Sequence, residues 1–566
     1  MREQFRTCPR TGLIFHRPAE NLIKANAVAA VVFLLVGGFL GLLVVLTRWQ
    51  AVHLLGPDTF YQALTGHGVI TLLVWIIFFE IALLYFCAST LLRSRLATPR
   101  LGWLAFGLMM IGAAMTAIAI LQGGSSVMMT SYVPMPAAPQ FYLGLIIFAV
   151  GALIGCFIFL GTLVIARAER TYEGSIPLVT FGALTACIIA IFTIASGAVI
   201  LVPTFLWSVG YISQIDPLMY RVIWWAMGHS SQQINVAAHI SVWYAIAAIV
   251  FGARPMSERV SRMAFLLYIF FLQLASAHHI LVDPGVGTEW KLFNTSYAMY
   301  LAVLASMIHG LTVPGAIEVS QREKGLNNGL FEWLRKAPWG NPVFSGMFIS
   351  LVGFGFLGGI TGVIMGTEQL NLIIHNTMYV PGHFHPTVAV GTTLAFMAIS
   401  YYLVPALFQR ELVLPTLAKW QPYLFGIGTS LMGLFQMGAG TLGVSRRHWD
   451  MAFAGSPFSF EYGGTAHMMM GLAGFFGVIS SIGAAAFIII MVGTILFGKR
   501  VSEKSEYTTK RPARLPRAEP APDHSNIGVA GFVAPGTFIL ALVFLATFVV
   551  YFFLNFGYLS SVWPMS

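Results

Sequence analysis

The chain has 566 residues, of which 57% are hydrophobic and only 9% are charged, and its mean hydropathy is +0.79. A water-soluble domain of this composition would lack the polar surface that keeps it in solution. The composition therefore excludes a soluble globular protein and predicts an integral membrane protein. The net charge of +10 is accounted for by membrane orientation, and no nucleic-acid partner is expected.

Long apolar segments recur along the whole chain, and each has about the length needed to cross a hydrocarbon core of ~30 Å. Such segments must be helices, because lipid offers no partners to backbone polar groups. We therefore expect an all-α, polytopic membrane bundle of about 13 transmembrane helices, forming a single domain over residues 1–566. The expected spans are 26–48, 67–92, 103–122, 140–167, 176–205, 218–251, 262–281, 292–318, 344–366, 370–404, 422–444, 463–497 and 530–556.

The distribution of basic residues predicts the orientation of these spans. With a cytoplasmic N-terminus, 26 of the 31 Lys and Arg lie on the cytoplasmic side, as the positive-inside rule requires. We expect a cytoplasmic tail at 1–25, a Pro-rich cytoplasmic linker at 499–529 and a periplasmic C-terminus, in a bacterial or archaeal cytoplasmic membrane. The five exceptions are Arg48, Arg221, Lys291, Arg446 and Arg447.

Histidines inside membrane spans are rare and usually mark ion paths, metals or cofactors. Single histidines within helices, His239 and His309, are expected to form core hydrogen bonds. The others gather at a similar depth on four predicted helices, which unrelated core histidines would not do. These are His67, His229, His278, His279, His375, His383 and His385.

The spacing of His383 and His385 indicates a helix between two planar cofactors. Two residues correspond to about 200° of helical rotation, so the two imidazoles point to nearly opposite sides and can each bind an iron. His67 can complete the axial pair of the second iron, which gives a six-coordinate, low-spin haem. His383 would hold a haem whose other face stays open.

Three further imidazoles offer a second metal site that faces the open haem. They belong to His229 and to the adjacent His278 and His279. Adjacent helical residues diverge by about 100°, so joint binding by His278 and His279 requires a local distortion of the helix. Three neutral nitrogens suit copper or iron, and a metal beside an open haem is a site for diatomic molecules.

Five motifs make the chain resemble the catalytic subunit, subunit I, of the haem–copper oxidase superfamily, and its B-type branch in particular. They are "FYQALTGHGVI", "IWWAMGH", "AHHILVDPG", "HNTMYVPGHFH" and "SRRHWD", in the order of the family, and the similarity runs nearly end to end. The resemblance implies the haem–copper oxidase subunit I fold with two haems and one non-haem metal. It assigns His67 and His385 to the low-spin haem, His383 to the high-spin haem, and His229, His278 and His279 to the metal.

The same resemblance implies the contacts of the haem propionates and the supply of electrons. Arg446 and Arg447, with His375 nearby, would pair with the propionates on the periplasmic side, where arginine is suited to carboxylates. A small cupredoxin-like or cytochrome subunit on that side would deliver electrons, since the chain has no CxxCH haem-attachment motif. Cytochrome c, a cupredoxin or quinol would be the electron donor.

One residue departs from the oxygen-reducing members of this branch. They have a tyrosine four residues after the first metal-binding histidine, where this chain has Gln233; another branch takes its tyrosine from the seventh span, where this chain has Leu272. Nitric oxide reductases of the superfamily lack this tyrosine, and the better-known ones have a glutamate instead. We expect Gln233 to face the metal site, and Gln232, turned by about 100°, to contact a neighbouring helix.

These features predict a respiratory nitric oxide reductase of denitrification, which converts two NO, two electrons and two protons to nitrous oxide. The alternative is a terminal oxygen reductase, a cytochrome c or quinol oxidase. A haem-bearing transporter or gas sensor is a third, non-enzymatic possibility. Glu80 lies in the middle of the second span, where a carboxylate is costly; it is either a proton relay or one partner of a buried structural pair.

Overall fold

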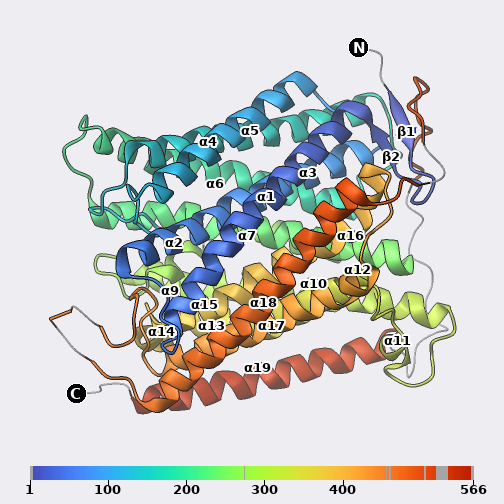
Figure 1. The fold of residues 1–566 in the computed structure, drawn as a ribbon. Coiled ribbons are helices and arrows are strands. Elements are labelled where there is room, and N and C mark those ends of the chain that lie inside the picture. Colours follow the sequence, from blue (N-terminus) through green and yellow to red (C-terminus); the bar gives the residue numbers. More distant parts are fainter. Residues whose placement is uncertain are drawn as a thin grey trace.

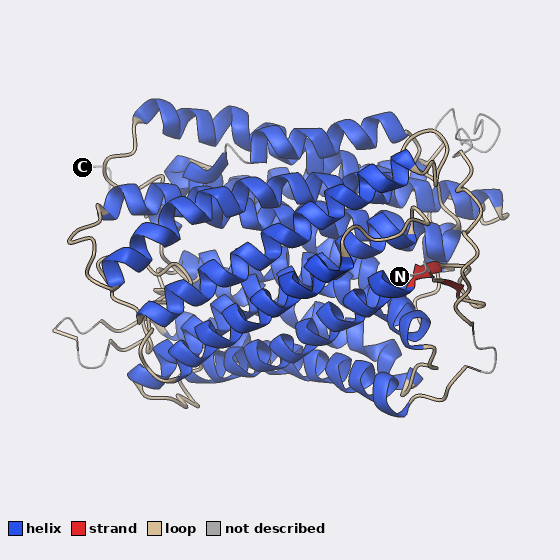
Figure 2. Cartoon of the chain, turned by 90° about the horizontal axis from the view of Figure 1, so that it is seen from above, coloured by secondary structure: helices blue, strands red, loops and turns tan. Residues whose placement is uncertain are grey.

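The protein is a bundle of long helices that run side by side between two ends (Figures 1 and 2). The computed structural model describes residues 4–272, 275–453, 456–457, 460–501, 505–517 and 533–562. Within this part of the chain, eleven helices are long and apolar enough to cross a membrane. The predicted all-α, multi-pass membrane bundle is confirmed.

The long helices in chain order are α1 (Arg17–Arg48), α2 (Pro57–Val69), α3 (Ile76–Tyr85), α4 (Pro99–Leu121), α5 (Pro139–Ala168), α6 (Leu178–Ser208), α7 (Pro217–Phe251), α8 (Glu258–Leu267), α10 (Met299–Glu323), α12 (Pro342–Gly353), α16 (Leu394–Phe408), α17 (Pro415–Thr441), α18 (Gly464–Phe497) and α19 (Pro535–Ser561). Short helices are α9 (Thr288–Phe293), α11 (Glu332–Arg335), α13 (Ile360–Gly366), α14 (Glu368–Ile374) and α15 (Tyr379–Phe384). Wider, π-helical turns are η1 (Ile70–Trp75), η2 (Phe86–Thr90), η3 (Tyr268–Leu272), η5 (Asn294–Ala298), η6 (Phe354–Gly359) and η7 (His385–Thr393), and η4 (Ala275–His279) is a 3₁₀ helix.

Two of the thirteen expected spans are not among the eleven apolar helices. The span expected at 422–444 is α17, which is long but contains Gln421, Gln436 and several glycines; both glutamines are buried against neighbouring helices. The span expected at 262–281 is not a single α-helix: α8 is followed by η3 and η4. With α17 and the segment that begins with α8, the described part of the chain has thirteen candidate crossings, and an odd number agrees with β1 and the C-terminal end of α19 lying at opposite ends of the bundle (Figure 1).

Two expected spans near the predicted histidines differ from the structure in their start or their continuity. The second continuous helix begins at Pro57 rather than at 67, because proline at the first helical position starts an amphipathic turn whose Phe60 and Ala63 are buried. The span expected at 370–404 divides into α14 and α15 with a non-helical segment between them. That segment is held from outside, where Met378 N donates to Val444 O and Arg446 N donates to Asn376 O.

Glycines let α15 lie directly against α17. A Cβ atom added to Gly433 would lie 2.7 Å from Gly382 O, and one added to Gly440 would lie 1.9 Å from Tyr379 N. Small residues allow this close backbone approach between membrane helices. The contact fixes the position of α15, which carries His383 and leads directly into His385.

The N-terminal segment forms a small clamp at one end of the bundle. Strand β1 (Phe5–Thr7) pairs with β2 (Ile14–His16), and Phe5 also bridges to Thr508. Arg6 forms a buried ion pair with Glu20, whose carboxylate also accepts from the Tyr507 hydroxyl. The described residues of the predicted linker 499–529 thus contact the tail 1–25, while 502–504 and 518–532 lie outside the described residues. Helix α1 already begins at Arg17, before the apolar segment expected from 26.

Candidate functional site

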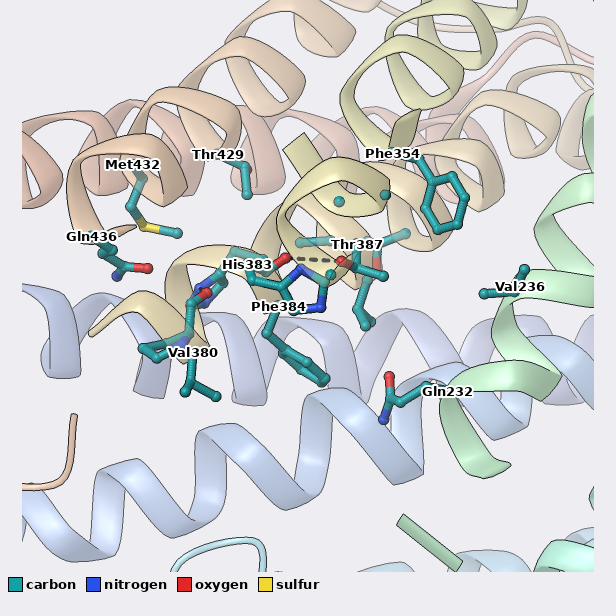
Figure 3. Close-up of a pocket in the computed structure, with 18 of the residues that line it drawn as sticks. Gln232, Val236, Phe354, Val380, His383, Phe384, Thr387, Thr429, Met432 and Gln436 are labelled. Atoms are coloured by element: carbon teal, nitrogen blue, oxygen red, sulfur yellow. Dashed lines mark hydrogen bonds between the residues drawn. The ribbon is translucent and has the colours of Figure 1, made fainter. Parts of the chain in front are cut away.

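A central cavity of about 1230 Å³ lies inside the bundle. Ordinary small-molecule sites measure about 300–1,000 Å³, so this one can hold ligands larger than a typical metabolite. Figure 3 shows Gln232 and Val236 of α7 on one side and His383 with Phe384 on the other. The cavity is lined by six of the predicted histidines and by both predicted arginines: His67, His229, His278, His279, His383, His385, Arg446 and Arg447.

The three histidines predicted to bind the non-haem metal lie together. One ring nitrogen of each of His229, His278 and His279 lies within 4.8 Å of the other two. His229 Nδ1 and His279 Nε2 are 3.0 Å apart, and the rings of His229 and His278 are nearly perpendicular at 4.4 Å. The distortion that the adjacent pair requires is the 3₁₀ helix η4, whose tighter winding ends at His279.

The Gln233 side chain contacts one of these histidines. Its Nε2 lies 2.9 Å from His229 Nε2, one helical turn away on α7. His229 Nδ1 lies against His279, and the amide contacts the other ring nitrogen. A contact of this kind fixes the ring and selects which nitrogen is left for a metal. On the other side of the cluster, Trp225 stacks on His279 at 3.8 Å.

The expectation for Gln232 was wrong. Its side chain lines the central cavity instead of leaving it for a neighbouring helix (Figure 3). Gln232 Nε2 donates to Ser231 Oγ at 3.3 Å, and its buried Oε1 has no hydrogen-bond partner. The cavity is wide enough that residues about 100° apart on α7 both face it.

His67 and His385 form a facing pair. Their rings are 6.3 Å apart and inclined by only 19°. His67 Nδ1 lies 2.9 Å from Gly37 O, and His385 Nδ1 lies 2.7 Å from Pro381 O. Each Nδ1–H therefore donates to a backbone carbonyl, which leaves each Nε2 free to bind a metal.

The spacing of this pair fits one metal ion between the rings. A metal–imidazole bond is about 2 Å long, so two such bonds and half a ring on either side span about 6 Å. Gly41 of α1 is required here, because a Cβ atom at Gly41 would lie 2.6 Å from the His67 ring. The residues fit an axially ligated haem iron.

His383 faces the cavity as a single ligand. Its Nδ1 lies 2.9 Å from Thr361 Oγ1 on α13, and this hydroxyl itself donates to the Leu357 and Gly358 carbonyls. The Nδ1–H of His383 therefore donates to Thr361, and Nε2 is left for a metal.

Positive charge exceeds negative charge beside the cavity, at the end of the bundle that carries Arg221, Arg446 and Arg447, which we call the arginine end. Arg221 Nε lies 3.2 Å from Asp283 Oδ2, and His375 Nε2 lies 3.8 Å from Asp283 Oδ1. Burial, reinforced by repulsion from Arg447, lowers the pKa of Arg446 to about 9. Burial and the arginines lower the pKa of His375 to about 4, so His375 is neutral at pH 7. Asp283 pairs with Arg221 and lies near His375, and its one negative charge does not balance the charges of Arg221, Arg446 and Arg447, which suits anionic groups such as haem propionates.

Arg48, at the C-terminal end of α1, holds the segment that carries the two arginines. Its guanidinium donates to the carbonyls of Ser445, Arg446 and His448. No motif pointed to this role, but Arg48 was one of the five basic residues on the side that is poor in them, which was the available signal.

The structure places the tyrosine hydroxyls near the seventh span away from the histidine cluster. The Tyr268 hydroxyl bonds to Ser306 Oγ at 2.9 Å, and Tyr268 does not line the cavity. Among the tyrosines, all of which are described, only Tyr300 lines the cavity, and 55% of it is exposed. At Gln233 the described histidine cluster has an amide beside His229.

A line of hydroxyl groups between α7, α8 and α10 was missed by the sequence analysis. The Tyr244 hydroxyl donates to Ser261 Oγ at 3.0 Å and lies 2.6 Å from Thr312 Oγ1. It also lies 3.0 Å from His309 Nδ1, which confirms that His309 is hydrogen-bonded in the core. His239 is likewise bonded, to Thr392 Oγ1 at 3.0 Å.

A second hydroxyl pair, Tyr268 and Ser306, lies between this line and the central cavity. Ser306 lines the cavity and bonds to Tyr268, whose ring is 5.7 Å from that of His309. Ser306, His309 and Thr312 recur every third residue and so lie on one face of α10. That spacing is the signal that could have identified them.

Comparison with known proteins identifies the family. A family model described as "Cytochrome C and Quinol oxidase polypeptide I" matches residues 21–486. This chain belongs to that family. Cytochrome c oxidase subunit 1 of Thermus thermophilus is 30% identical over 474 residues, covering 82% of this chain and 80% of that protein. The corresponding Synechocystis protein is 24% identical over 415 residues, covering 69% and 70%.

A solved structure agrees with this family over almost the whole chain. A haem–copper terminal oxidase dimer, determined by cryo-electron microscopy, superposes with a TM-score of 0.81 at 28% identity, covering 94% of this chain and 92% of that one. As a member of the cytochrome c and quinol oxidase polypeptide I family, the chain is a respiratory oxidoreductase subunit of the haem–copper type. The names of the relatives point to cytochrome c oxidase rather than to nitric oxide reductase.

Proposed function

We propose that the chain is the catalytic subunit of a nitric oxide reductase, which converts two NO to nitrous oxide and water with two electrons and two protons. The observation that carries this proposal is the amide of Gln233, which lies 2.9 Å from His229 Nε2 where oxygen-reducing relatives of this branch have a phenol. An amide supplies neither the electron nor the proton that such a phenol gives to O–O cleavage. Coupling two NO needs only two electrons.

We further propose which residues hold the cofactors. His67 and His385 hold the low-spin haem, His383 holds the high-spin haem, and His229, His278 and His279 hold copper or iron. When bound, the haems and the metal would supply the electrons for reduction of the gas. Arg446, Arg447 and His375 face the propionates.

The polypeptide orients the metal-binding side chains, excludes water from the cavity and delivers protons. Gln233 keeps the His229 ring in place, and the amide of Gln232, inside the same cavity, can donate a hydrogen bond to a bound gas molecule. The apolar walls exclude bulk water, which strengthens these interactions. Protons enter along the hydroxyl line from Ser261 through Tyr244 to Ser306.

Electrons come from another protein in this proposal. A cupredoxin-like or cytochrome subunit docks at the arginine end and receives electrons from cytochrome c or a cupredoxin, or quinol is the donor instead. We place the complex in a bacterial or archaeal cytoplasmic membrane, with the N-terminus in the cytoplasm.

Oxygen reduction is the second candidate, and the names of the relatives favour it. Turnover of the purified complex with a reduced donor, with NO and O₂ followed in parallel, separates the two. Rapid NO loss with stoichiometric nitrous oxide and slow O₂ uptake is the expected result. Fast four-electron O₂ reduction with negligible NO turnover would overturn the proposal. Iron and copper analysis of the same sample tests the sensor possibility, which predicts haem without a second metal.

A further inference from the structure

A second cavity lies beside the central one and contains a buried carboxylate. It measures about 120 Å³ and is enclosed by α3, α5, α6 and α7. Glu80 of α3 lines it and is only 6% exposed, and its Oε1 has no hydrogen-bond partner. Among the described residues, no cationic side chain contacts Glu80, so the structure does not support the expected alternative of a buried ion pair. An isolated ionised carboxylate is costly in such surroundings, so Glu80 is held as the neutral acid.

A second unpartnered polar group faces the same cavity. Asn235 of α7 is 3% exposed, and its amide nitrogen Nδ2 has no hydrogen-bond partner. A water needs about 10–15 Å³ of cavity volume and two to four polar partners. The 120 Å³ of this cavity therefore has room for several waters between Glu80 and Asn235. The titratable groups that face it from the packed helices are the thiols of Cys156 on α5 and Cys187 on α6, while α7 contributes an amide and a hydroxyl.

The second cavity is linked to the central one through α7. Asn235, Ser231 and Gly228 lie on one face of α7 at spacings of four and three residues, and all three line the second cavity. Ser231 Oγ accepts from Gln232 Nε2, and Gln232 lines the central cavity and has an unpartnered Oε1. Leu72 and Met129 line both cavities, so only a thin wall separates them.

We propose that Glu80 and Asn235 form a water-filled proton-holding site that supplies the metal centre through Ser231 and Gln232. One O–H bond of the Glu80 acid breaks and its proton passes to a cavity water, and the carboxylate regains a proton from bulk water between turnovers. No electron moves at Glu80. This proposal rests on the proposed function only because reduction of the gas consumes protons. Reduction of NO and reduction of O₂ both do so.

Infrared difference spectroscopy of the whole complex, reduced minus oxidised, tests the site without turnover. The C=O band of a protonated carboxylic acid should appear, shift in D₂O and vanish in Glu80→Gln. Asn235→Leu leaves Glu80 in place and should shift the band. The absence of this band in the unaltered protein, or a band that is unchanged in Glu80→Gln, would overturn the proposal. This test does not depend on whether the complex reduces NO or O₂.

Turnover provides the second readout. Glu80→Gln should slow gas reduction by at least about tenfold, a loss typical of impaired proton delivery, with the haem spectra unchanged. Thr193→Val is the matched control, because Thr193 lines the same cavity but its hydroxyl already donates to Ile189 O. Equal losses in Glu80→Gln and Thr193→Val, or full activity in Glu80→Gln, would contradict the proton-holding role.

Discussion

At the scale of single residues, helical rotation limits where the histidines can point, and packing between helices sets what surrounds them. The spacing of His383 and His385, and the adjacency of His278 and His279, limit geometry through helical rotation alone. The orientation of Gln232 depends on how wide the cavity is, which is a property of packing between helices. The role of Arg48 depends on carbonyls that lie far along the chain, and no local pattern records them.

Substitution of Gln233 tests the residue on which the proposed preference for NO rests. Gln233→Leu removes the amide that contacts His229 while keeping much of its volume, and NO turnover should fall by about 10- to 100-fold, the usual cost of losing a partner of a metal-binding histidine. Purified variants are assayed for NO loss and for metal content. Gln233→Glu, which keeps the shape and adds a charge, is the matched comparison. Undiminished NO turnover in Gln233→Leu would remove Gln233 from the mechanism.

At the scale of elements, position is set by glycine contacts and by turns that depart from the α-helix. The π-helical turn η7 begins at His385, directly after α15, and the 3₁₀ helix η4 ends at His279. The adjacency of His278 and His279 predicted a distortion at η4, whereas the π-helical turn η7 had no signal in a periodicity that assumes regular α-helix. The helix α17 was expected as one of the long apolar spans. The role of its glycines is evident only from the contact between α17 and α15.

Gly433→Ala tests the contact between α15 and α17. The added methyl would lie 2.7 Å from Gly382 O and from Pro386 Cδ, and overpacking of this kind costs about 1–3 kcal/mol. Displacement of α15 should also weaken the His385 ligand and reduce the low-spin haem spectrum. Gly438→Ala on the same helix is the control, because its methyl meets only the flexible Met469 sulfur at 3.1 Å. Equal spectra in both variants would contradict this account of α15.

At the scale of the whole molecule, composition and the length of the apolar segments predicted the membrane bundle, and the eleven apolar helices of the described chain agree roughly with the thirteen expected spans. The clamp at the N-terminus was not predictable, since it joins segments from both ends of the chain. Arg6 donates to Glu20, to Ser505 and to the Ala406 and Leu407 carbonyls at the end of α16. These partners share no sequence pattern, and only the folded chain brings them together.

Removal of Arg6 should destabilise the protein. Arg6→Met leaves the buried Glu20 carboxylate without its main partner, which typically costs about 3–5 kcal/mol, and the double variant Arg6→Met/Glu20→Leu should recover much of the loss. Thermal unfolding of the purified protein measures both effects. Lys336→Ala is the control, because Lys336 pairs with Glu332 but is 62% exposed and contributes at most about 1 kcal/mol. A double variant less stable than Arg6→Met would contradict the ion-pair explanation.

The hold of Arg48 on the segment after α17 has a consequence for biosynthesis. Arg48 is among the first membrane-spanning residues to leave the ribosome, whereas Ser445, Arg446 and His448 follow almost four hundred residues later. The segment before α15 is fixed by these same late residues. Until these residues are synthesised, the helix that carries His383 and leads into His385 is not held in position. The chain should therefore acquire its cofactors late, after α17 has entered the membrane, and products truncated before that helix should leave the ribosome unable to retain them.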